Sequence, residues 1–421
     1  MKKPIFFSLF ASVLACAANA EEILTEPLTL SNVAFTQDRM TQKVTVTYDL
    51  SNGGDSALVF MDVMTNGVSI GRENVKTLSG AVSAGIDDPV AEGKSKQIVW
   101  DARKDWSGNL VTNAAVVLTA FYKDKLYNIP GIYMVVDISG GTSAESFPVS
   151  YSLEGPDLSN DACRSSQLWL RRIEPCTFMM GSPATEANRN ASYEKLHEVT
   201  LTKPYFAAVF EMTEAQHYNL TGKGNSAKYS AIGAVSWNTI RGADTVWPLP
   251  DEVPETSIVG ILRKKTGIGG FDLPTDAQWE CACRAGTMTA WNNGTTNTVD
   301  TASDPELLKL GWHAQDKKSA AMKAGLKEAN GWGLYDMHGN VMEWVLDFSC
   351  ADNSADTLDP KGYSSAVAGS QKHIARSGSY LADRATTSCR SAARDTSYAP
   401  TIEYQNLGYR IFCNFGDPLG K

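Results

Sequence analysis

The chain has 421 residues, of which 43% are hydrophobic and 20% are charged, a composition typical of globular rather than disordered proteins. This length is enough for two or three domains. The formal net charge of −9 gives no reason to expect a polyanionic partner, so nucleic-acid binding is excluded as a leading function.

The N-terminal segment MKKPIFFSLFASVLACAANA, residues 1–20, has the layout of a secretory signal peptide. Two lysines precede a short apolar stretch at 5–15, and the sequence ANA forms a small-x-small cleavage site. The stretch is shorter than the roughly 20 apolar residues that span a bilayer, and no later segment is long and apolar enough. We therefore predict a secreted or periplasmic protein. Lipid attachment through Cys16 is the alternative.

Cleavage would leave seven cysteines, an odd number, so at least one is unpaired unless it bonds another chain. They are Cys163, Cys176, Cys281, Cys283, Cys350, Cys389 and Cys413. An exported protein meets conditions in which disulfides form, but spacing alone does not give the connectivity. Two of them, Cys281 and Cys283, lie two positions apart on a predicted helix. They therefore face different ways, which argues against a metal clamp.

Residues 21–122 are predicted to form an all-β domain. The segment KVTVTYDL at 43–50 alternates apolar and polar residues, as a half-buried strand does. Further strand-like segments follow at short intervals with turn residues between them, which indicates a β-sandwich with a structural or adhesive role. Residues 123–165 contain one strand-like stretch, YMVVDISGG, and otherwise read as a polar linker rich in glycine and proline.

Residues 166–421 are predicted to form a loop-rich α+β domain in which tryptophan, glycine and arginine recur. Helical patterns are few. The clearest is LPTDAQWECACRAG at 273–286, where Thr275 is a good N-cap and Gln278 completes a capping box. Long irregular connections in a compact domain are typically functional or ordered by something bound.

The segment ANGWGLYDMHGNVMEWVLDF, residues 329–348, places oxygen ligands in a turn broken by glycine. Asp336, Asn340 and Glu343 supply side-chain oxygens, and the turn exposes carbonyls, a combination that hard cations such as calcium prefer. The alternative is that its aromatic residues are core and its acids only hydrogen-bond the turn.

This segment resembles the signature of the formylglycine-generating enzyme family, also called sulfatase-modifying factors. Motifs in the family's order cover about residues 166–415. They are TFMMGSP, HEVTLTKPYFAAVFEMTEAQ, VSWNTI, LPTDAQWECACRAG, ARSGSY, CRSAARD and NLGYRIF. The resemblance implies a compact, loop-rich variant of the C-type lectin fold.

The resemblance also implies a calcium site. In the family one calcium is held by backbone carbonyls and a glutamate in this turn, and the matching positions are Asp336, Gly339, Val341 and Glu343. Family members often carry a second site upstream. Its counterpart here, residues 311–327, departs from the pattern, so we do not predict it.

The residues at the family's active-site positions differ more strongly from the family's pattern. The family's enzymes oxidise a substrate cysteine with molecular oxygen, using two cysteines five positions apart that bind copper(I) as soft thiolate ligands. Counting forward from Tyr380, those positions are Ala382 and Thr387, whereas counting back from SAAR puts the second on Thr386. Both counts miss Cys389. Neither alanine nor threonine can do a thiolate's work, so the defining chemistry is predicted to be absent.

Other chemistries find no support in the residues. The five histidines are not paired at helical ligand spacing, and no serine lies in a nucleophile elbow. Asp383, Arg384, Arg390 and Arg394 could bind an anionic or sugar ligand through forked hydrogen bonds. For Arg390 and Arg394 we favour pairing with acids inside the loops. Asp383 and Arg384 lie where the family's active-site groove would be.

We therefore predict an exported pseudoenzyme, a β-sandwich followed by a calcium-stabilised domain of the formylglycine-generating type, that binds a protein or carbohydrate ligand. The rival hypothesis is an active oxidase that depends on copper and oxygen. It would use Cys389 after a loop shift, and its partner would be a sulfatase whose cysteine becomes formylglycine.

Overall fold

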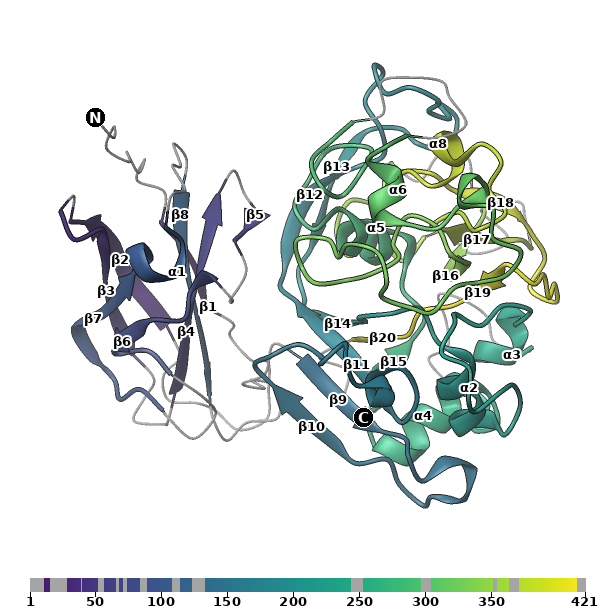
Figure 1. Ribbon diagram of the computed structural model, residues 1–421, viewed down its shortest axis with the longest axis horizontal. Helices are drawn as coiled ribbons and strands as arrows, with labels where there is room; N and C mark the ends of the chain where they lie inside the picture. The colour runs from purple at the N-terminus through teal and green to yellow at the C-terminus, as the bar shows by residue number, and fades with distance from the viewer. Residues whose placement is uncertain are drawn as a thin grey trace. The chain divides into compact units, whose positions relative to one another are not determined.

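The computed structural model describes residues 11–15, 29–38, 40–51, 57–65, 68–70, 74–83, 89–107, 114–122, 133–243, 253–296, 304–350, 354–362 and 371–414. The chain divides into two compact units, Met1–Gly131 and Ile132–Lys421 (Figure 1). Among these residues, no helix combines the length and the apolar character needed to cross a membrane.

The first unit contains two four-stranded sheets, with strand orders β1-β8-β4-β5 and β2-β3-β7-β6. The strands are β1 (Ala11–Ala15), β2 (Thr29–Gln37), β3 (Lys43–Ser51), β4 (Ala57–Thr65), β5 (Val68–Ser69), β6 (Leu78–Gly80), β7 (Gly93–Asp101) and β8 (Ala114–Tyr122), and α1 (Ala102–Asp105) follows β7. The alternation at 43–50 is that of β3, whose buried side chains include Val46 and Tyr48. These residues share one apolar core with Val59 and Leu118 of the other sheet. Two sheets that share one core are a requirement of a β-sandwich. The assignment of the first unit as a β-sandwich stays a prediction.

Strand β1 falls within the predicted signal peptide and pairs in parallel with β8. Cleavage after residue 20 would remove this strand from the mature protein. The rest of the predicted peptide, including Cys16, lies outside the described residues. Export therefore stays a prediction.

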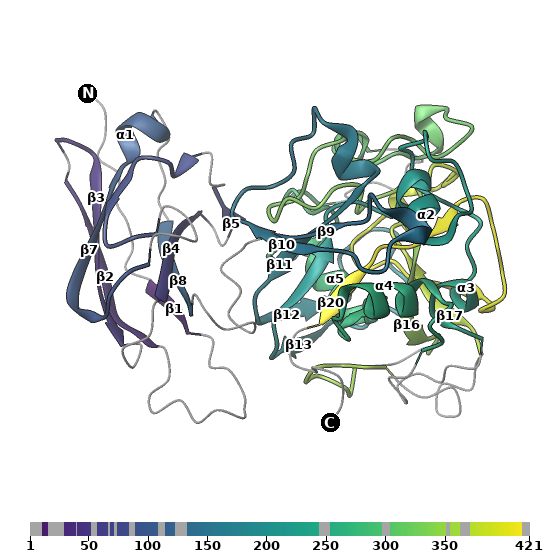
Figure 2. The same ribbon diagram turned by 90° about the horizontal axis from the view of Figure 1, so that it is seen from below.

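The second unit is built on a six-stranded sheet with the order β10-β9-β11-β14-β20-β15. Its strands are β9 (Tyr133–Asp137), β10 (Val149–Ser152), β11 (Gln167–Ile173), β14 (Tyr205–Ala208), β15 (Phe271–Asp272) and β20 (Phe412–Asn414). β9 pairs antiparallel with both β10 and β11, and the three lie side by side in Figures 1 and 2. Residues 133–165 are therefore part of the second unit and not a linker, because backbone pairing fixes β9 to its sheet. Residues 123–132 lie outside the described residues.

Two smaller sheets and several short helices complete the second unit. The sheets have the orders β12-β13 and β18-β17-β16-β19. The strands are β12 (Cys176–Met180), β13 (His197–Leu201), β16 (Met342–Phe348), β17 (His373–Arg376), β18 (Asp395–Tyr398) and β19 (Leu407–Gly408). The helices are α2 (Glu214–Thr221), α3 (Trp237–Arg241), α4 (Ile258–Thr266), α5 (Asp276–Arg284), α6 (Leu307–Leu310) and α8 (Ala385–Ser388), with 3-10 turns η2 (Gly141–Ser143), η3 (Asp161–Arg164) and η4 (Ala314–Asp316). The described part of the chain is thus mostly β with some helices, and the arrangement of a β-sandwich followed by a loop-rich α+β domain stays a prediction.

Helix α5 is the central helix of the second unit's core. Its predicted capping box is present, because the Thr275 hydroxyl accepts the Gln278 backbone N–H while the Gln278 side chain accepts the Thr275 N–H. Every residue of the helix except Gln278 is buried. Its apolar side chains, among them Trp279, pack with residues of β12, β13 and β16. This helix also carries the acids that hold the C-terminal segment in place.

Candidate functional site: a glycine-broken turn and the closing segment

Three of the four residues predicted to hold calcium lie in the turn before β16, and the fourth, Glu343, is the second residue of that strand and has the clearest contacts. Its carboxylate is fully buried and accepts three hydrogen bonds from Arg410, at 2.7, 3.0 and 3.0 Å. The indole nitrogen of Trp279 donates a fourth at 2.6 Å. The guanidinium therefore already supplies the positive charge that this carboxylate requires.

Two further carboxyl groups are buried in the same region. Glu211 accepts hydrogen bonds from the Asn340 amide at 2.6 Å and from the Val341 backbone at 2.9 Å. One oxygen of Asp336, Oδ2, accepts the Gly325 N–H at 2.7 Å, while Oδ1 is buried with no hydrogen-bond partner in the described structure. Burial raises the pKa of Asp336 to about 6, and burial together with the neighbouring acids raises the pKa of Glu211.

These contacts test the predicted calcium site. A carboxylate offers about four lone-pair positions, and Glu343 already uses them on Arg410 and Trp279. Asp336 Oδ1 is the one orphaned side-chain oxygen of the set that a cation could use. Within the described ranges, no group of three or more His, Cys, Asp or Glu side chains is arranged to hold a metal. In this arrangement Glu343 does not fit as a calcium ligand, and calcium at this turn stays a prediction.

The positions expected for the family's catalytic cysteines carry no thiol. Ala382 is half-buried and packs against an apolar cluster. Thr386 is fully buried in α8, and its hydroxyl accepts a hydrogen bond from the Asn188 amide at 3.3 Å. Thr387, the other candidate position, is half-buried. A methyl group and two hydroxyls thus stand where copper(I) would need thiolates.

Cys389 is a free, fully buried thiol in the same apolar cluster. The cluster comprises Ala290, Trp291, Leu307, Leu310, Ala385 and Cys389. Burial raises the pKa of Cys389 to about 12, so the group stays a protonated thiol at neutral pH. A protonated thiol enclosed by apolar side chains is suited to packing and not to metal binding or redox chemistry.

A buried histidine that sequence reasoning did not single out connects the turn to the closing segment. His338 Nδ1 donates to the Cys389 carbonyl at 2.7 Å, and Nε2 accepts the Asn292 backbone N–H at 3.0 Å. Both ring nitrogens are therefore used, which fixes the neutral tautomer. Burial lowers the pKa of His338 to about 4. His338 therefore has a structural role, because its two hydrogen bonds join the turn to Cys389 and Asn292. Nothing in the neighbouring sequence indicated this role.

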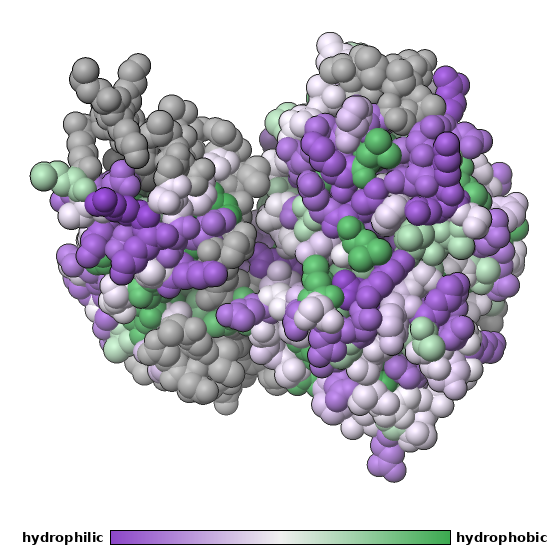
Figure 3. Space-filling view, viewed as in Figure 1, coloured by the Kyte–Doolittle hydropathy of each residue, from purple (hydrophilic) through white to green (hydrophobic). Residues whose placement is uncertain are grey.

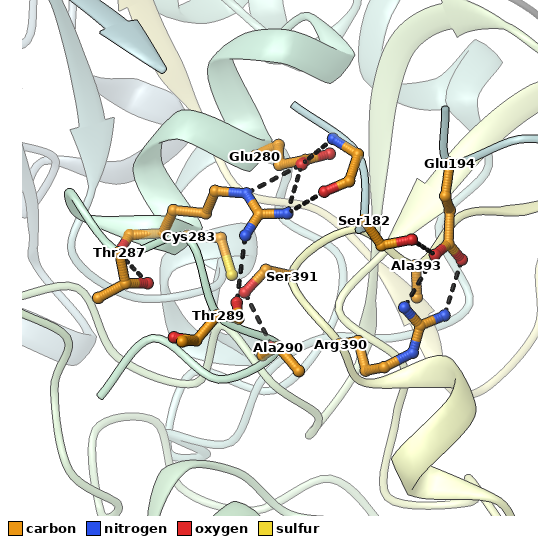
Figure 4. A network of polar contacts seen from close by, with 12 residues as sticks. Ser182, Glu194, Glu280, Cys283, Thr287, Thr289, Ala290, Arg390, Ser391 and Ala393 are labelled. Carbon is orange, nitrogen blue, oxygen red and sulfur yellow. Dashed lines mark hydrogen bonds and ion pairs between the residues drawn. The ribbon is translucent and has the colours of Figure 1, made fainter. Parts of the chain in front are cut away.

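The arginines of the closing segment form buried ion pairs. Arg390 contacts Glu194 at 2.7 Å (Figure 4). It also contacts Glu186 at 2.5 Å, and both acids lie on the connection between β12 and β13. Arg394 contacts Asp276 of α5 at 2.7 Å. Both arginines pair with buried acids, as we favoured, but only the partners of Arg390 lie in a loop, whereas those of Arg394 lie on helix α5.

Glu280 is the centre of a second group of ion pairs, part of which Figure 4 shows. Its carboxylate contacts Arg284 at 2.8 Å, Arg376 at 2.9 Å and Arg394 at 3.4 Å, and it accepts the Gly181 N–H at 2.7 Å. Burial opposes ionisation, yet the three guanidiniums hold the pKa of Glu280 below its ordinary value. The ion pairs of Arg376 and Arg394 with Glu280 thus fix the closing segment to α5.

Asp383 and Arg384 lie on the outside of this fixed segment. Both side chains are exposed and immediately precede α8, and Leu381 beside them is 41% exposed. They are the charged residues of the closing segment that face solvent. Their part in binding stays a prediction.

Comparison with known proteins gives the class. Residues 164–415 match the family described as "Sulfatase-modifying factor enzyme 1-like domain", and the chain therefore belongs to that family. The resemblance identified from the sequence motifs is confirmed.

Individual relatives agree with this placement. The chain is 31% identical over 212 residues to the formylglycine-generating enzyme of Streptomyces coelicolor. This match covers 43% of this chain and 62% of the relative. The Mus musculus formylglycine-generating enzyme is 27% identical over 159 residues, covering 34% and 38%. The matches thus span less than two thirds of these relatives.

Two solved structures are similar in fold at low sequence identity. Treponema denticola variable protein 1 has a TM-score of 0.44 and 21% identity, covering 59% of this chain and 96% of its own. PvdO from Pseudomonas aeruginosa has a TM-score of 0.47 and 20% identity, covering 59% and 94%.

Proposed function

We propose that this protein is an exported member of the family that has lost cysteine oxidation and binds a protein or carbohydrate ligand. One observation carries the proposal. The positions of the two catalytic cysteines hold Ala382 and a threonine, Thr386 or Thr387, while the thiol of Cys389 is protonated and enclosed by apolar side chains.

The chemistry follows from these side chains. Copper(I) is held by soft thiolates, and a methyl or hydroxyl group supplies neither the ligand nor the electrons. Recruiting Cys389 would require its apolar cluster to open and its proton to leave. It would also break the hydrogen bond between the Cys389 carbonyl and His338. Opening the cluster and breaking this hydrogen bond both cost free energy.

The binding half of the proposal rests on the rigidity of the closing segment. Buried ion pairs through Arg390 and Arg394 fix its backbone, and Asp383 and Arg384 project from it into solvent. A carboxylate and a guanidinium on a rigid base can hold sugar hydroxyls or charged side chains by forked hydrogen bonds. On the face seen in Figure 3, the apolar residues of the second unit form small groups among polar ones, which suits a polar ligand.

The first experiment tests catalysis. The purified chain is loaded with copper(I) and incubated with oxygen and a peptide carrying the Cys-x-Pro-x-Arg motif of sulfatases. We expect no tight copper binding and no formylglycine. The second candidate function is the copper- and oxygen-dependent oxidase acting on a sulfatase, which the similarity to formylglycine-generating enzymes favours. Turnover that Cys389→Ala abolishes would establish the oxidase and overturn the binding-only proposal.

The second experiment tests binding. The chain is screened against immobilised glycans and against extracellular protein extracts, and the Asp383→Ala/Arg384→Ala variant is compared on whatever is bound. We expect at least a tenfold loss of affinity. A matched control is Glu255→Ala/Lys264→Ala, which removes another exposed charge pair and should bind as the wild type does. Unchanged affinity in the first variant would remove these two residues from the site, and no ligand in either screen would contradict a binding role.

A further inference from the structure

Strand β8 (Ala114–Tyr122) lies one place from the edge of its sheet, and β1 is the strand that covers its outer side. Over its whole length β8 pairs antiparallel with β4, without a break in register. On the opposite side, Ala11–Ala15 of β1 pairs in parallel with residues 116–120. These five residues of β8 are therefore paired on both sides only while β1 is present.

β1 belongs to the segment that is predicted to be cleaved. Its five residues lie within the signal peptide 1–20, so a processed chain that begins at Glu21 would lack them. β8 would remain in place, because Val116, Leu118 and Ala120 are at most 1% exposed in the core that the two sheets share. The processed protein would therefore present the backbone N–H and C=O groups of a fixed strand along an open edge.

The other edge strands of the first unit are short or irregular. β5 has two residues, β6 has three, and β2 is interrupted by a register shift between Ser31 and Ala34. Proteins limit pairing between edges by such features, or by charged residues and proline on the edge strand. β8 has nine residues with the sequence AAVVLTAFY, which contains no charge, proline or glycine. A bare β8 edge is thus a strong site for strand addition.

We propose that the β8 edge of the processed chain pairs with the β8 edge of a second copy and forms a two-fold symmetric dimer. The two strands run antiparallel, and residues 116–120 of each copy regain the pairing that β1 supplied. Because the same edge serves both copies, the contact closes and adds no further subunits. The inference rests on the export part of the proposed function, since cleavage opens the edge, and it is independent of ligand binding.

The N-terminal residues that remain after cleavage are a poor replacement for β1. Residues 21–28 have the sequence EEILTEPL, with three glutamates and one proline. Both residue types are disfavoured in strands, and proline cannot donate to a strand ladder. Residue 28 also directly precedes β2, which belongs to the other sheet. A second β8, which has no charge and contains valine, threonine and aromatic residues, suits the open edge better.

The test uses the processed chain, purified after export and identified as residues 21–421 by its intact mass. We expect light scattering to give the mass of a dimer. Hydrogen exchange should show protected amides at residues 116–120, and dilution of the wild type until the dimer dissociates should expose them. This dilution experiment needs no variant, so the inference stays testable where a substitution prevents folding.

A pair of lysines on the β8 edge should weaken the dimer. Ala115 and Val117 are half-buried and alternate with the buried residues of β8, so Ala115→Lys/Val117→Lys would bring like charges together across the paired strands. We expect the dissociation constant to rise at least about tenfold. The matched control is Thr45→Lys/Thr47→Lys on β3, whose two sides are already paired with β2 and β7, and it should leave the dimer unchanged.

Four results would overturn the inference. The first is a processed chain that is monomeric, whether its 116–120 amides are exposed or are covered by its own residues 21–28. The second is a dimer whose protection at 116–120 survives dissociation. The third is a folded Ala115→Lys/Val117→Lys variant that dimerises as tightly as the control, which would place the contact elsewhere. The fourth is an intact mass that retains residues 11–15, because β1 would then keep the edge covered. None of these results changes the binding test at Asp383 and Arg384.

Discussion

Replacing Glu343 by glutamine should strongly destabilise the second unit. The side chains of Glu343 and Arg410 are both 0% exposed, so the substitution leaves a buried guanidinium without its main counter-charge. The new amide would also turn an N–H toward the donors of Arg410 or Trp279. Breaking a buried pair in this way costs about 3–5 kcal/mol. Glu211 and Asp336 also interact with Arg410, so we expect the lower end, about 3 kcal/mol.

The assay is thermal and urea unfolding followed by tryptophan fluorescence, in which about 3 kcal/mol corresponds to a Tm loss of roughly 6–12 °C. The matched control is Glu255→Gln, which breaks the exposed pair with Lys264 and should cost less than about 1 kcal/mol. The double variant Glu343→Gln/Arg410→Met should recover part of the loss, because it removes both charges. A loss at Glu343 no larger than the control's would refute the buried-pair reasoning.

Three further predictions concern calcium, pH and copper. If calcium binds at the turn, it would use the orphaned Oδ1 of Asp336, so a chelator should lower the Tm of the wild type but not of Asp336→Asn, and equal sensitivity of the two would remove the site. Burial lowers the pKa of His373 to about 4, so between pH 6.5 and 4 the folded state binds fewer protons than the unfolded state. His373 should therefore contribute a fall in the free energy of unfolding as the pH falls through that window, by up to about 1.4 kcal/mol per pH unit. His217 and His338, whose pKa burial also lowers to about 4, contribute in the same direction, so His373→Gln should reduce the slope by its own share. Ala382→Cys/Thr387→Cys restores the family's spacing and should gain tight copper(I) binding; wild-type binding of equal strength would contradict the loss of the metal site.

Local signals in the sequence were sufficient for the elements that local hydrogen bonds define. The capping box of Thr275 and Gln278 lies within four residues of chain, and the structure forms both of its bonds. The alternation at 43–50 likewise predicts β3, because the side-chain period of a strand is local. The family motifs of the second unit are also short contiguous stretches, so they can be identified from the sequence without knowing which distant residues they contact.

Pairing partners that lie far apart in sequence could not be predicted in this way. Residues 133–165 look like a linker because glycine, proline and polar residues dominate them. The strand-like stretch predicted there is β9, but its pairing with β10 and β11, which makes it part of the second unit's sheet, is not a local property of the sequence. The contact between Glu343 and Arg410 spans 67 positions, and that between Arg390 and Glu194 spans 196. Only the assembled fold shows that both acids are satisfied by arginine.

This long-range pairing changes the interpretation of the closing segment, residues 375–394. Its guanidinium groups looked like candidates for an anionic ligand, yet Arg376, Arg390 and Arg394 are spent on acids of α5 and of the connection after β12. Charges used to anchor a backbone cannot also bind a ligand without releasing that backbone. The exposed charged residues of the segment are Asp383 and Arg384. If they bind a ligand, they do so from a segment whose position four buried carboxylates already fix, so little conformational entropy is lost on binding.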